Sequence, residues 1–191
     1  MAKRLAFSFV LVTLLALCSG TLCAQSGTVR RAPGFALPDW QNHYVKLSEH
    51  RGEVVVLEFM QTKCHYCHTT AQILEELYRK YKDQGLTVIS VSHDPNREKD
   101  VQPFVERYGL TYTFVLGDLG IAVRYIGITP QHSFFSIPYI FLIDRNGNIA
   151  GEYVRDHTPQ FFDNEKENLE KEIVRLLQQK PGALRRTSTD R

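Results

Sequence analysis

The sequence has few cysteines, little net charge and a single long apolar run. Its 191 residues include four cysteines, and 23 basic against 21 acidic residues leave a formal net charge of +2. A chain this close to neutral lacks the basic surface that nucleic-acid-binding proteins use, so no nucleic-acid partner is expected. The length is sufficient for one domain with a buried core.

The apolar run lies at the N-terminus and is typical of a secretory signal peptide. Two basic residues precede the run from Leu5 to Leu17, and small residues follow it up to Ala24. The run is short for a membrane span, but an uncleaved anchor stays open. We therefore expect residues 1–24 to be a signal peptide, residues 25–31 a flexible lead-in, and the protein to be periplasmic or otherwise extracytoplasmic.

Cleavage after Ala24 would leave Cys64 and Cys67 as the only cysteines. It would also remove two basic residues and no acidic one, so the formal charge would fall from +2 to 0. Small exported proteins that depend on disulfides carry many more cysteines, and a bridge between two such close residues restrains the unfolded chain little. The pair is therefore better explained by chemistry than by stability.

At this pair the sequence predicts that a buried strand passes into a helix. Residues 54–60 are mostly apolar and begin with three valines, and apolar residues recur at helical spacing over 71–81. Cys64 then lies at or before the helix N-terminus and Cys67 in the first turn. Unpaired amide groups and the helix dipole stabilise a thiolate at that place, so the pattern predicts a redox-active dithiol.

The same periodicities predict further strands and helices. Because a helix and a glycine separate the strand at 54–60 from the next at 86–91, the two are expected to form a parallel pair. An Asn-Gly pair at 146–147 predicts a type I′ hairpin turn. The other predicted strands cover 44–48, 112–116, 139–143 and 149–154, and the other helices cover 97–108, 117–125 and 160–179.

Several motifs stand in a fixed order along the chain. They are Ala32-Pro33-x-Phe35-x-Leu37-Pro38, Leu47-Ser48-x-x-Arg51-Gly52, Cys64-x-x-Cys67, Leu86-Thr87-Val88-Ile89-x-Val91-Ser92, and Ile137-Pro138 before Phe141-Leu142-Ile143-Asp144-Arg145-x-Gly147. Over residues 32–179 this set resembles the thioredoxin superfamily and, within it, the exported TlpA/ResA-like thiol-disulfide oxidoreductases. The resemblance implies a thioredoxin fold, an α/β domain with a central mixed β-sheet flanked by helices and an N-terminal extension. A basic tail at 180–191 is expected to be disordered.

The sequence departs from this family at three places. Lys63 stands where tryptophan is usual before the first cysteine, and His65-Tyr66 replaces the common proline-containing pair. Residues 131–135 lengthen the approach to Pro138. These departures bear on the redox potential and on the choice of client, and not on the fold.

The two cysteines are expected to divide the reaction between them. Cys64 attacks a client disulfide, and Cys67 resolves the mixed disulfide that forms. Lys63 and a protonated His65 are expected to favour the Cys64 thiolate. These charges predict a redox potential that is less reducing than that of thioredoxin.

Three further residues complete the predicted site. Glu58 lies in an otherwise apolar strand and matches the buried acid of thioredoxins, although a solvent-facing carboxyl at a sheet edge is the alternative. A buried carboxyl with a raised pKa could carry the proton of Cys67. Pro138 matches the family's cis-proline opposite the disulfide, and the backbone of Ile137 is expected to bind an extended client segment.

The expected function is thiol-disulfide exchange in the cell envelope. The protein would cycle the Cys64–Cys67 pair between dithiol and disulfide, with no metal and no cofactor besides that pair. The resemblance implies a reductive direction, with a membrane thiol reductase as electron donor and apocytochrome c or another oxidised envelope protein as client. A monomer is expected.

Two alternatives stay open at this point. Ser92–Arg97 is faintly similar to a segment of copper-binding thioredoxin-fold chaperones, which would make the protein a metal carrier. Cys64-x-x-Cys67-His68 is also a complete haem-attachment motif. Against haem, Met60 is the only methionine after the leader and lies too near the motif to be a distal ligand. The histidines at 68, 93, 132 and 157 are otherwise expected at the surface or in loops.

Overall fold

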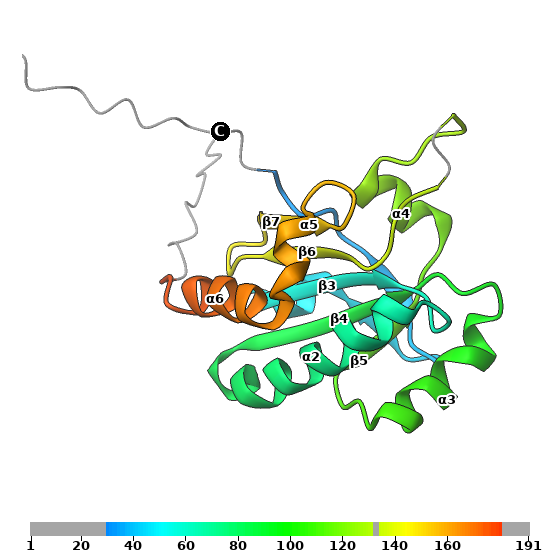
Figure 1. The fold of residues 1–191 in the computed structure, drawn as a ribbon, viewed down its shortest axis with the longest axis horizontal. Coiled ribbons are helices and arrows are strands. Elements are labelled where there is room, and N and C mark those ends of the chain that lie inside the picture. Colours follow the sequence, from blue (N-terminus) through cyan, green and yellow to red (C-terminus); the bar gives the residue numbers. More distant parts are fainter. Residues whose placement is uncertain (1–29, 132–133, 181–191) are drawn as a thin grey trace, which may run out of the picture.

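The computed structural model describes residues 30–131 and 134–180 (Figure 1). The expected signal peptide, most of the lead-in and nearly all of the basic tail lie outside the described residues. Pairing begins at the end of the expected lead-in, where the Ile149 amide donates to the Arg30 carbonyl and Arg31 forms an isolated bridge with Asn148. Within the described ranges, no helix is both long enough and apolar enough to cross a membrane.

A five-stranded mixed sheet forms the centre of the domain, in the order β5-β4-β3-β6-β7. β3 (Val54–Met60), β4 (Leu86–Ser92) and β5 (Thr113–Leu116) run parallel, whereas β6 (Tyr139–Ile143) and β7 (Ile149–Val154) are antiparallel to their neighbours. The predicted parallel pair is thus confirmed. All seven residues of β3 are buried, because the strand is central and both its faces are covered.

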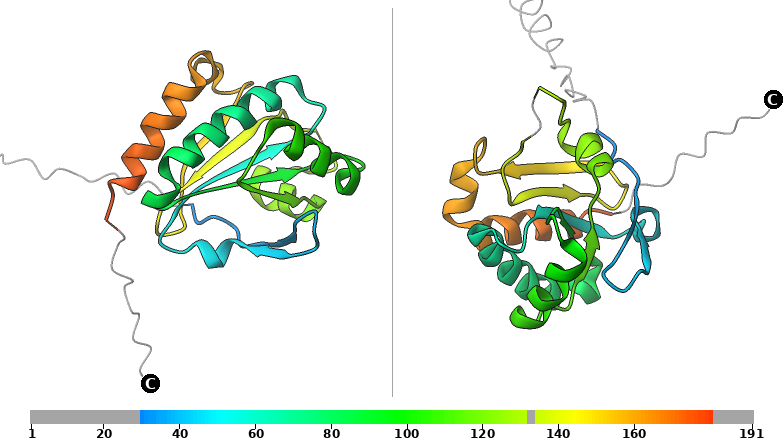
Figure 2. Two further views of the ribbon diagram at one scale, coloured as in Figure 1. Left: turned by 90° about the horizontal axis from the view of Figure 1, so that it is seen from below. Right: turned by 90° about the vertical axis from the view of Figure 1, so that its right-hand side faces the viewer.

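Three helices cover one face of the sheet, as the left view of Figure 2 shows. They are α2 (His65–Tyr81), α3 (Arg97–Tyr108) and α6 (Glu165–Leu177). Their apolar residues pack on the alternate strand residues that point to this side, among them Val56 and Met60 of β3. A short 3₁₀ turn, η2 (Lys82–Gln84), ends at Gly85, whose φ of 91° reverses the chain into β4.

The N-terminal segment and one helix cover the other face (Figure 2). β1 (Ala36–Pro38) and β2 (Tyr44–Lys46) form a small antiparallel ribbon, followed by the 3₁₀ turn η1 (Leu47–His50). α4 (Leu119–Ile126) completes this layer. Its Tyr125 packs on two rings of the sheet, with ring centroids 5.7 Å from Phe59 and 5.2 Å from Phe141.

Two local predictions were wrong. The helix predicted over 160–179 is two helices, α5 (Pro159–Asp163) and α6, because Asn164 has an extended φ of −133° between them. The Asn-Gly turn is not type I′, which needs a positive φ at both central residues, since only Gly147 has one (82°). The turn is instead built around Asp144, whose carboxylate accepts the amides of Asn146 and Asn148.

Candidate redox site

The two cysteines lie where β3 passes into α2, as predicted. Cys64 is the N-cap of α2, and its sulfur accepts the backbone N–H of Cys67 at 3.3 Å. Both cysteines are free thiols; Cys64 is partly exposed, and Cys67 is fully buried. Cys64 is therefore the sulfur that a client can reach, and Cys67 can react only with a group already attached at Cys64.

Glu58 is buried on the same side of β3 as the apolar residues that pack against α2. Its exposed fraction is 0%, which confirms the buried interpretation. Ser90 Oγ donates to Glu58 Oε2, whereas Oε1 has no hydrogen-bond partner among the described residues. Burial raises the pKa of Glu58 to about 8, with a smaller contribution from the charge of Glu165. The carboxyl is thus poised to take or release a proton near neutral pH.

Cys67 is influenced by this acid. Burial first, and then the negative charge of Glu58, raise the pKa of the Cys67 thiol well above its ordinary value. The Tyr112 hydroxyl lies 3.4 Å from Ser90 Oγ, and burial also raises the pKa of Tyr112. Since Ser90 has one proton and gives it to Glu58, Tyr112 is the donor to Ser90. The result is a buried chain of hydroxyl groups that ends at the acid beside Cys67.

The loop before Cys64 is held by a carboxylate from the neighbouring strand. Asp94, two residues after the end of β4, accepts the Thr62 amide at 2.9 Å and the Thr62 hydroxyl at 2.8 Å. Ser92 Oγ donates to the same carboxylate at 2.8 Å. Two residues of the segment that suggested a copper chaperone, Ser92 and Asp94, thus brace this loop.

His68 ties the first turn of α2 to the same loop and to α3. Its Nε2 lies 2.6 Å from the Thr62 carbonyl oxygen, and the Tyr108 hydroxyl lies 3.1 Å from its Nδ1. Because a carbonyl can only accept, Nε2 carries the proton and Nδ1 accepts from Tyr108. Both ring nitrogens are thus engaged, so His68 is not the surface residue that was expected. This arrangement gives no support to a haem ligand at His68.

The two predicted charge-tuning residues are both exposed. Lys63 Nζ lies 3.7 Å from Asp100 Oδ2 on α3, so part of its charge is directed away from Cys64. His65 begins α2, and its ring lies 5.9 Å from the ring of Tyr66. Both residues flank Cys64 in the chain, and Asp100 is a competing anion for Lys63.

Tyr66, between the cysteines in sequence, is stacked by a cation. The Arg155 guanidinium lies 4.1 Å from the centroid of the Tyr66 ring and 4.6 Å from that of Phe162. Arg155 Nη2 also lies 3.7 Å from Glu165 Oε2, and Thr70 Oγ1 donates to Glu165 Oε1 at 2.5 Å. Burial raises the pKa of Glu165, which Thr70 and Arg155 partly offset.

Ile137 and Pro138 lie opposite the first cysteine. Their peptide bond is cis, as the resemblance implied, and Pro138 is buried. Cys64 Sγ lies 3.8 Å from the Ile137 carbonyl oxygen. The segment before β6 is thus brought next to the partly exposed sulfur, where a client backbone would have to lie.

Several residues of the site were not identified from the sequence. Thr62, Asp94, Tyr108 and Arg155 were not singled out as supports of the dithiol. A signal for Asp94 existed, because it lies three residues after a strand predicted to be parallel to β3, and parallel strands end at the same edge of a sheet. Among residues 30–131 and 134–180, no three His, Cys, Asp or Glu side chains are grouped as a metal site would need.

Comparisons with known proteins agree with this geometry. Residues 29–151 match the model of the AhpC/TSA family. ResA, a thiol-disulfide oxidoreductase of Geobacillus kaustophilus, is 34% identical over 118 residues, which cover 62% of this chain and 64% of that protein. ResA of Geobacillus thermodenitrificans is 31% identical over 147 residues, covering 73% of this chain and 80% of that protein.

A solved structure shows the same fold. A Chlorobium tepidum protein described as thiol:disulfide interchange protein DsbE is 30% identical, with a TM-score of 0.64, and the match covers 78% of this chain and 96% of that one. The site thus combines a buried acid, a helix-capping cysteine and a cis-proline around a sheet of the order described above. The relatives of this chain are thiol-disulfide oxidoreductases. The chain belongs to the AhpC/TSA family and to the ResA-like group of thiol-disulfide oxidoreductases within the thioredoxin superfamily.

Proposed function

We propose that the protein is a cell-envelope thiol-disulfide oxidoreductase that passes electron pairs through Cys64 to protein clients. The observation that carries this proposal is the difference in access between the two thiols: Cys64 caps α2 beside Ile137, and Cys67 is buried behind it. A single accessible sulfur with a buried partner suits a two-step exchange.

In the reductive direction each step balances. The Cys64 thiolate attacks one sulfur of a client disulfide, and the other client sulfur leaves as a thiolate and takes a proton. Cys67 then loses its proton and attacks the Cys64 sulfur, which releases the second client thiolate. Two electrons pass to the client, and the Cys64–Cys67 disulfide remains to be reduced by a membrane thiol donor.

Glu58 is the base that we assign to the second step. A thiol with the raised pKa of Cys67 needs an acceptor for its proton, and a carboxyl with a pKa of about 8 can hold or release one near neutral pH. The charge influence of Glu58 on Cys67 supports this assignment. The buried Ser90 hydroxyl donates to Glu58 and so stabilises its negative charge.

Thiol trapping tests the reaction. The protein is quenched with acid, unfolded and alkylated, with and without prior dithiothreitol. Both cysteines should change together between blocked and free states, and a surrogate protein disulfide should be reduced in proportion. Cysteines that stay unreactive in both states, or that carry haem or a metal as isolated, would contradict the proposal and favour one of the two alternatives.

Trapping of clients tests the division of labour. Cys67→Ala removes the resolving thiol, so clients should accumulate on Cys64 as mixed disulfides. Cys64→Ala is the matched control, because the remaining thiol of the pair is buried and should trap far less. Recovery of equal amounts of disulfide-linked protein with both variants would show that access does not divide the roles.

A further inference from the structure

A second pocket lies at the far end of the sheet from the dithiol. It has a volume of about 290 Å³. Its lining residues are Arg31, Ala32 and Gly34 of the N-terminal segment, Leu47, Ser48, His50 and Arg51, Val55 near the start of β3, and Ile143, Asp144 and Gly147 at the end of β6 and in its turn. β3 separates the two places, since Cys64 follows the end of that strand. At roughly 3.3 Å per strand residue, the five steps from Val55 to Met60 alone span about 17 Å. Thiol-disulfide exchange has no use for this pocket.

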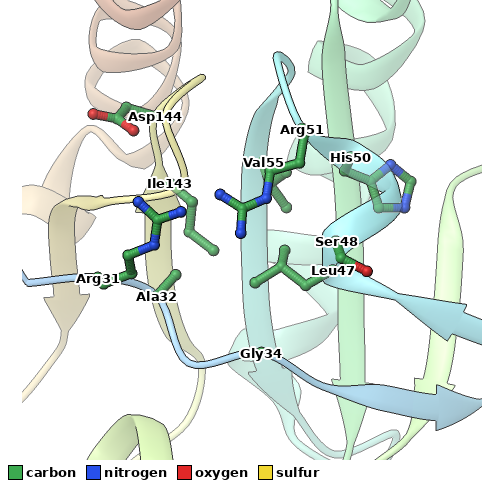
Figure 3. Close-up of a pocket in the computed structure, with 11 residues that line it drawn as sticks. Arg31, Ala32, Gly34, Leu47, Ser48, His50, Arg51, Val55, Ile143 and Asp144 are labelled. Carbon is green, nitrogen blue, oxygen red and sulfur yellow. The ribbon is translucent and has the colours of Figure 1, made fainter. Parts of the chain in front are cut away.

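Two arginines converge in the pocket. Figure 3 shows the guanidinium groups of Arg31 and Arg51 facing each other across it. Among the residues that the structure describes, neither side chain forms an ion pair. Two such cations repel each other, and an anion placed between them would remove that repulsion.

The surrounding backbone fixes both arginines to the turn between β6 and β7. Arg31 bridges Asn148, and the next amide, of Ala32, donates to the Gly147 carbonyl at 3.0 Å. Arg51 Nη1 donates to the Asn146 carbonyl at 3.4 Å. A Cβ on Gly147 would come within 2.9 Å of Arg51 Nη1, so glycine leaves the space that this guanidinium occupies. The backbone of Arg31 and the side chain of Arg51 are therefore both anchored to the same turn, and both side chains are exposed to solvent.

The acid nearest to the arginines does not neutralise them. Asp144 lines the pocket, but its carboxylate accepts the amides of Asn146 and Asn148 and the Asn148 side chain. In Figure 3 it points away from both guanidinium groups. His50, also at the pocket, lies with Nδ1 2.9 Å from Glu53 Oε2. The pocket thus presents positive charge with its local acids already engaged.

We infer that this pocket binds a phosphate-type oxyanion between Arg31 and Arg51. A tetrahedral anion offers enough oxygen atoms for both guanidinium forks, and arginine matches phosphate in shape and charge. The volume admits a small anion or a single headgroup and no large cofactor. The phosphate can belong to a small molecule or to a lipid headgroup, and the test separates these sources.

The test is a titration of the full chain with inorganic phosphate, followed by amide NMR shifts at constant ionic strength. Saturable shifts are expected at Ala32, Gly52 and Gly147, and none at Cys64 or Cys67. Arg51→Gln and Arg31→Gln should each weaken binding about tenfold, the size expected for loss of one charge-assisted hydrogen-bond partner. Arg124→Gln, which removes an exposed arginine from α4, is the matched control and should leave the affinity unchanged.

Vesicles distinguish the source of the phosphate. Sedimentation with phosphatidylglycerol vesicles, lost in Arg51→Gln and kept in Arg124→Gln, would assign the site to a headgroup, and phosphate binding without sedimentation would assign it to a soluble anion. Thiol-disulfide exchange should be unchanged in all three variants, which shows that they are folded. Absence of saturable binding to either probe, or equal weakening by Arg124→Gln, would overturn the inference.

Discussion

The two faces of the central sheet use the same strands and carry different chemistry. Toward α2 and α6 the sheet presents Glu58 and Ser90 among its apolar residues, and Glu165 is buried on α6. Toward α4 it presents an apolar layer rich in aromatic rings, with Phe59, Tyr125 and Phe141 in mutual contact. Successive side chains of a strand point to opposite faces of the sheet. Glu58 and Phe59 are neighbours in β3, but Glu58 faces α2 and Phe59 faces α4.

The difference shows where this protein accepts a buried charge. An acid in the α4 layer would serve no reaction, and it would destabilise the fold. In the α2 layer the burial of Glu58 also lowers the stability of the fold, but there the carboxyl can accept the proton of Cys67. If this interpretation is right, changes in the α2 layer should alter pH dependence and redox behaviour, and changes in the α4 layer should alter stability alone.

The largest effect is expected from Glu58→Gln. Glu58 has a folded-state pKa of about 8, above its ordinary 4.5. The folded state therefore keeps a proton that the unfolded chain loses, and the free energy of unfolding should fall as pH rises from 4.5 to 8. At about 1.4 kcal/mol per pKa unit, the shift corresponds to roughly 5 kcal/mol across this window. Glu58→Gln should remove this slope and slow the resolving step by Cys67.

Denaturant unfolding at several pH values, with stopped-flow exchange, measures both effects. Glu98→Gln replaces an exposed glutamate on α3 and is the control, for which the slope should be that of the wild type. An equal slope in Glu58→Gln and the wild type would show that Glu58 is charged in the folded protein at neutral pH.

The next largest effect belongs to the other face. Phe141→Ala removes a fully buried ring that contacts Phe59, Tyr125 and Tyr139. The cavity should lower the free energy of unfolding by about 3–5 kcal/mol. The redox potential of the cysteine pair should not change, because no group on this face touches either sulfur. Equilibration against glutathione at a temperature where the variant is folded tests this, and a shifted potential would show that the two layers are coupled.

A smaller effect is expected from the contact of Arg155 with Glu165. Arg155→Gln should destabilise the protein by about 1–2 kcal/mol, since it removes a cation stacked on Tyr66 and the partner of a buried carboxylate. Combined with Glu165→Gln, the loss should be smaller than the sum of the two single losses. A double-mutant cycle from denaturant unfolding gives the coupling energy, and strict additivity would mean that the two side chains act independently.

The smallest effect concerns the charge beside Cys64. Asp100→Asn frees Lys63 from its ion pair, and Lys63→Trp removes the cation. An exposed charge contact of about 0.3–1 kcal/mol corresponds to roughly 6–20 mV for a two-electron couple. The potential should rise in Asp100→Asn and fall in Lys63→Trp, and the double variant should match Lys63→Trp alone. Equal redox potentials in the wild type and the three variants would show that Lys63 does not influence the potential of the cysteine pair.

The sequence was sufficient for the parts of the molecule that depend on local patterns. The valine-rich run before Cys64 and the helical spacing after Cys67 predict the junction of β3 and α2, and the position of Glu58 within that run predicts a buried acid. The cis bond before Pro138 came from the resemblance and not from the residue. Contacts made only after folding were beyond such patterns.

The wrong or missing predictions have a common physical origin. The hydrogen bond between Thr62 and Asp94 depends on the register between β3 and β4. The apolar pattern of each strand taken alone does not determine that register. His68 was taken for a surface residue because its partners, Thr62 and Tyr108, come from a loop and from another helix. At Asn146 the side chain of Asp144 selected a different turn from the one that an Asn-Gly pair favours.

Because Cys67 is fully buried, its reactivity toward thiol reagents reports whether the protein is folded. Within the described part of the chain, a bulky thiol reagent meets one sulfur in the reduced native state, that of Cys64, and two in the unfolded state. The second equivalent of label can be taken up only when the α2 layer opens, so its rate reports the opening of that layer. The same asymmetry makes Cys64 the accessible thiol of the folded domain, and a domain that carries only this pair of cysteines could be attached to a surface through it in one orientation.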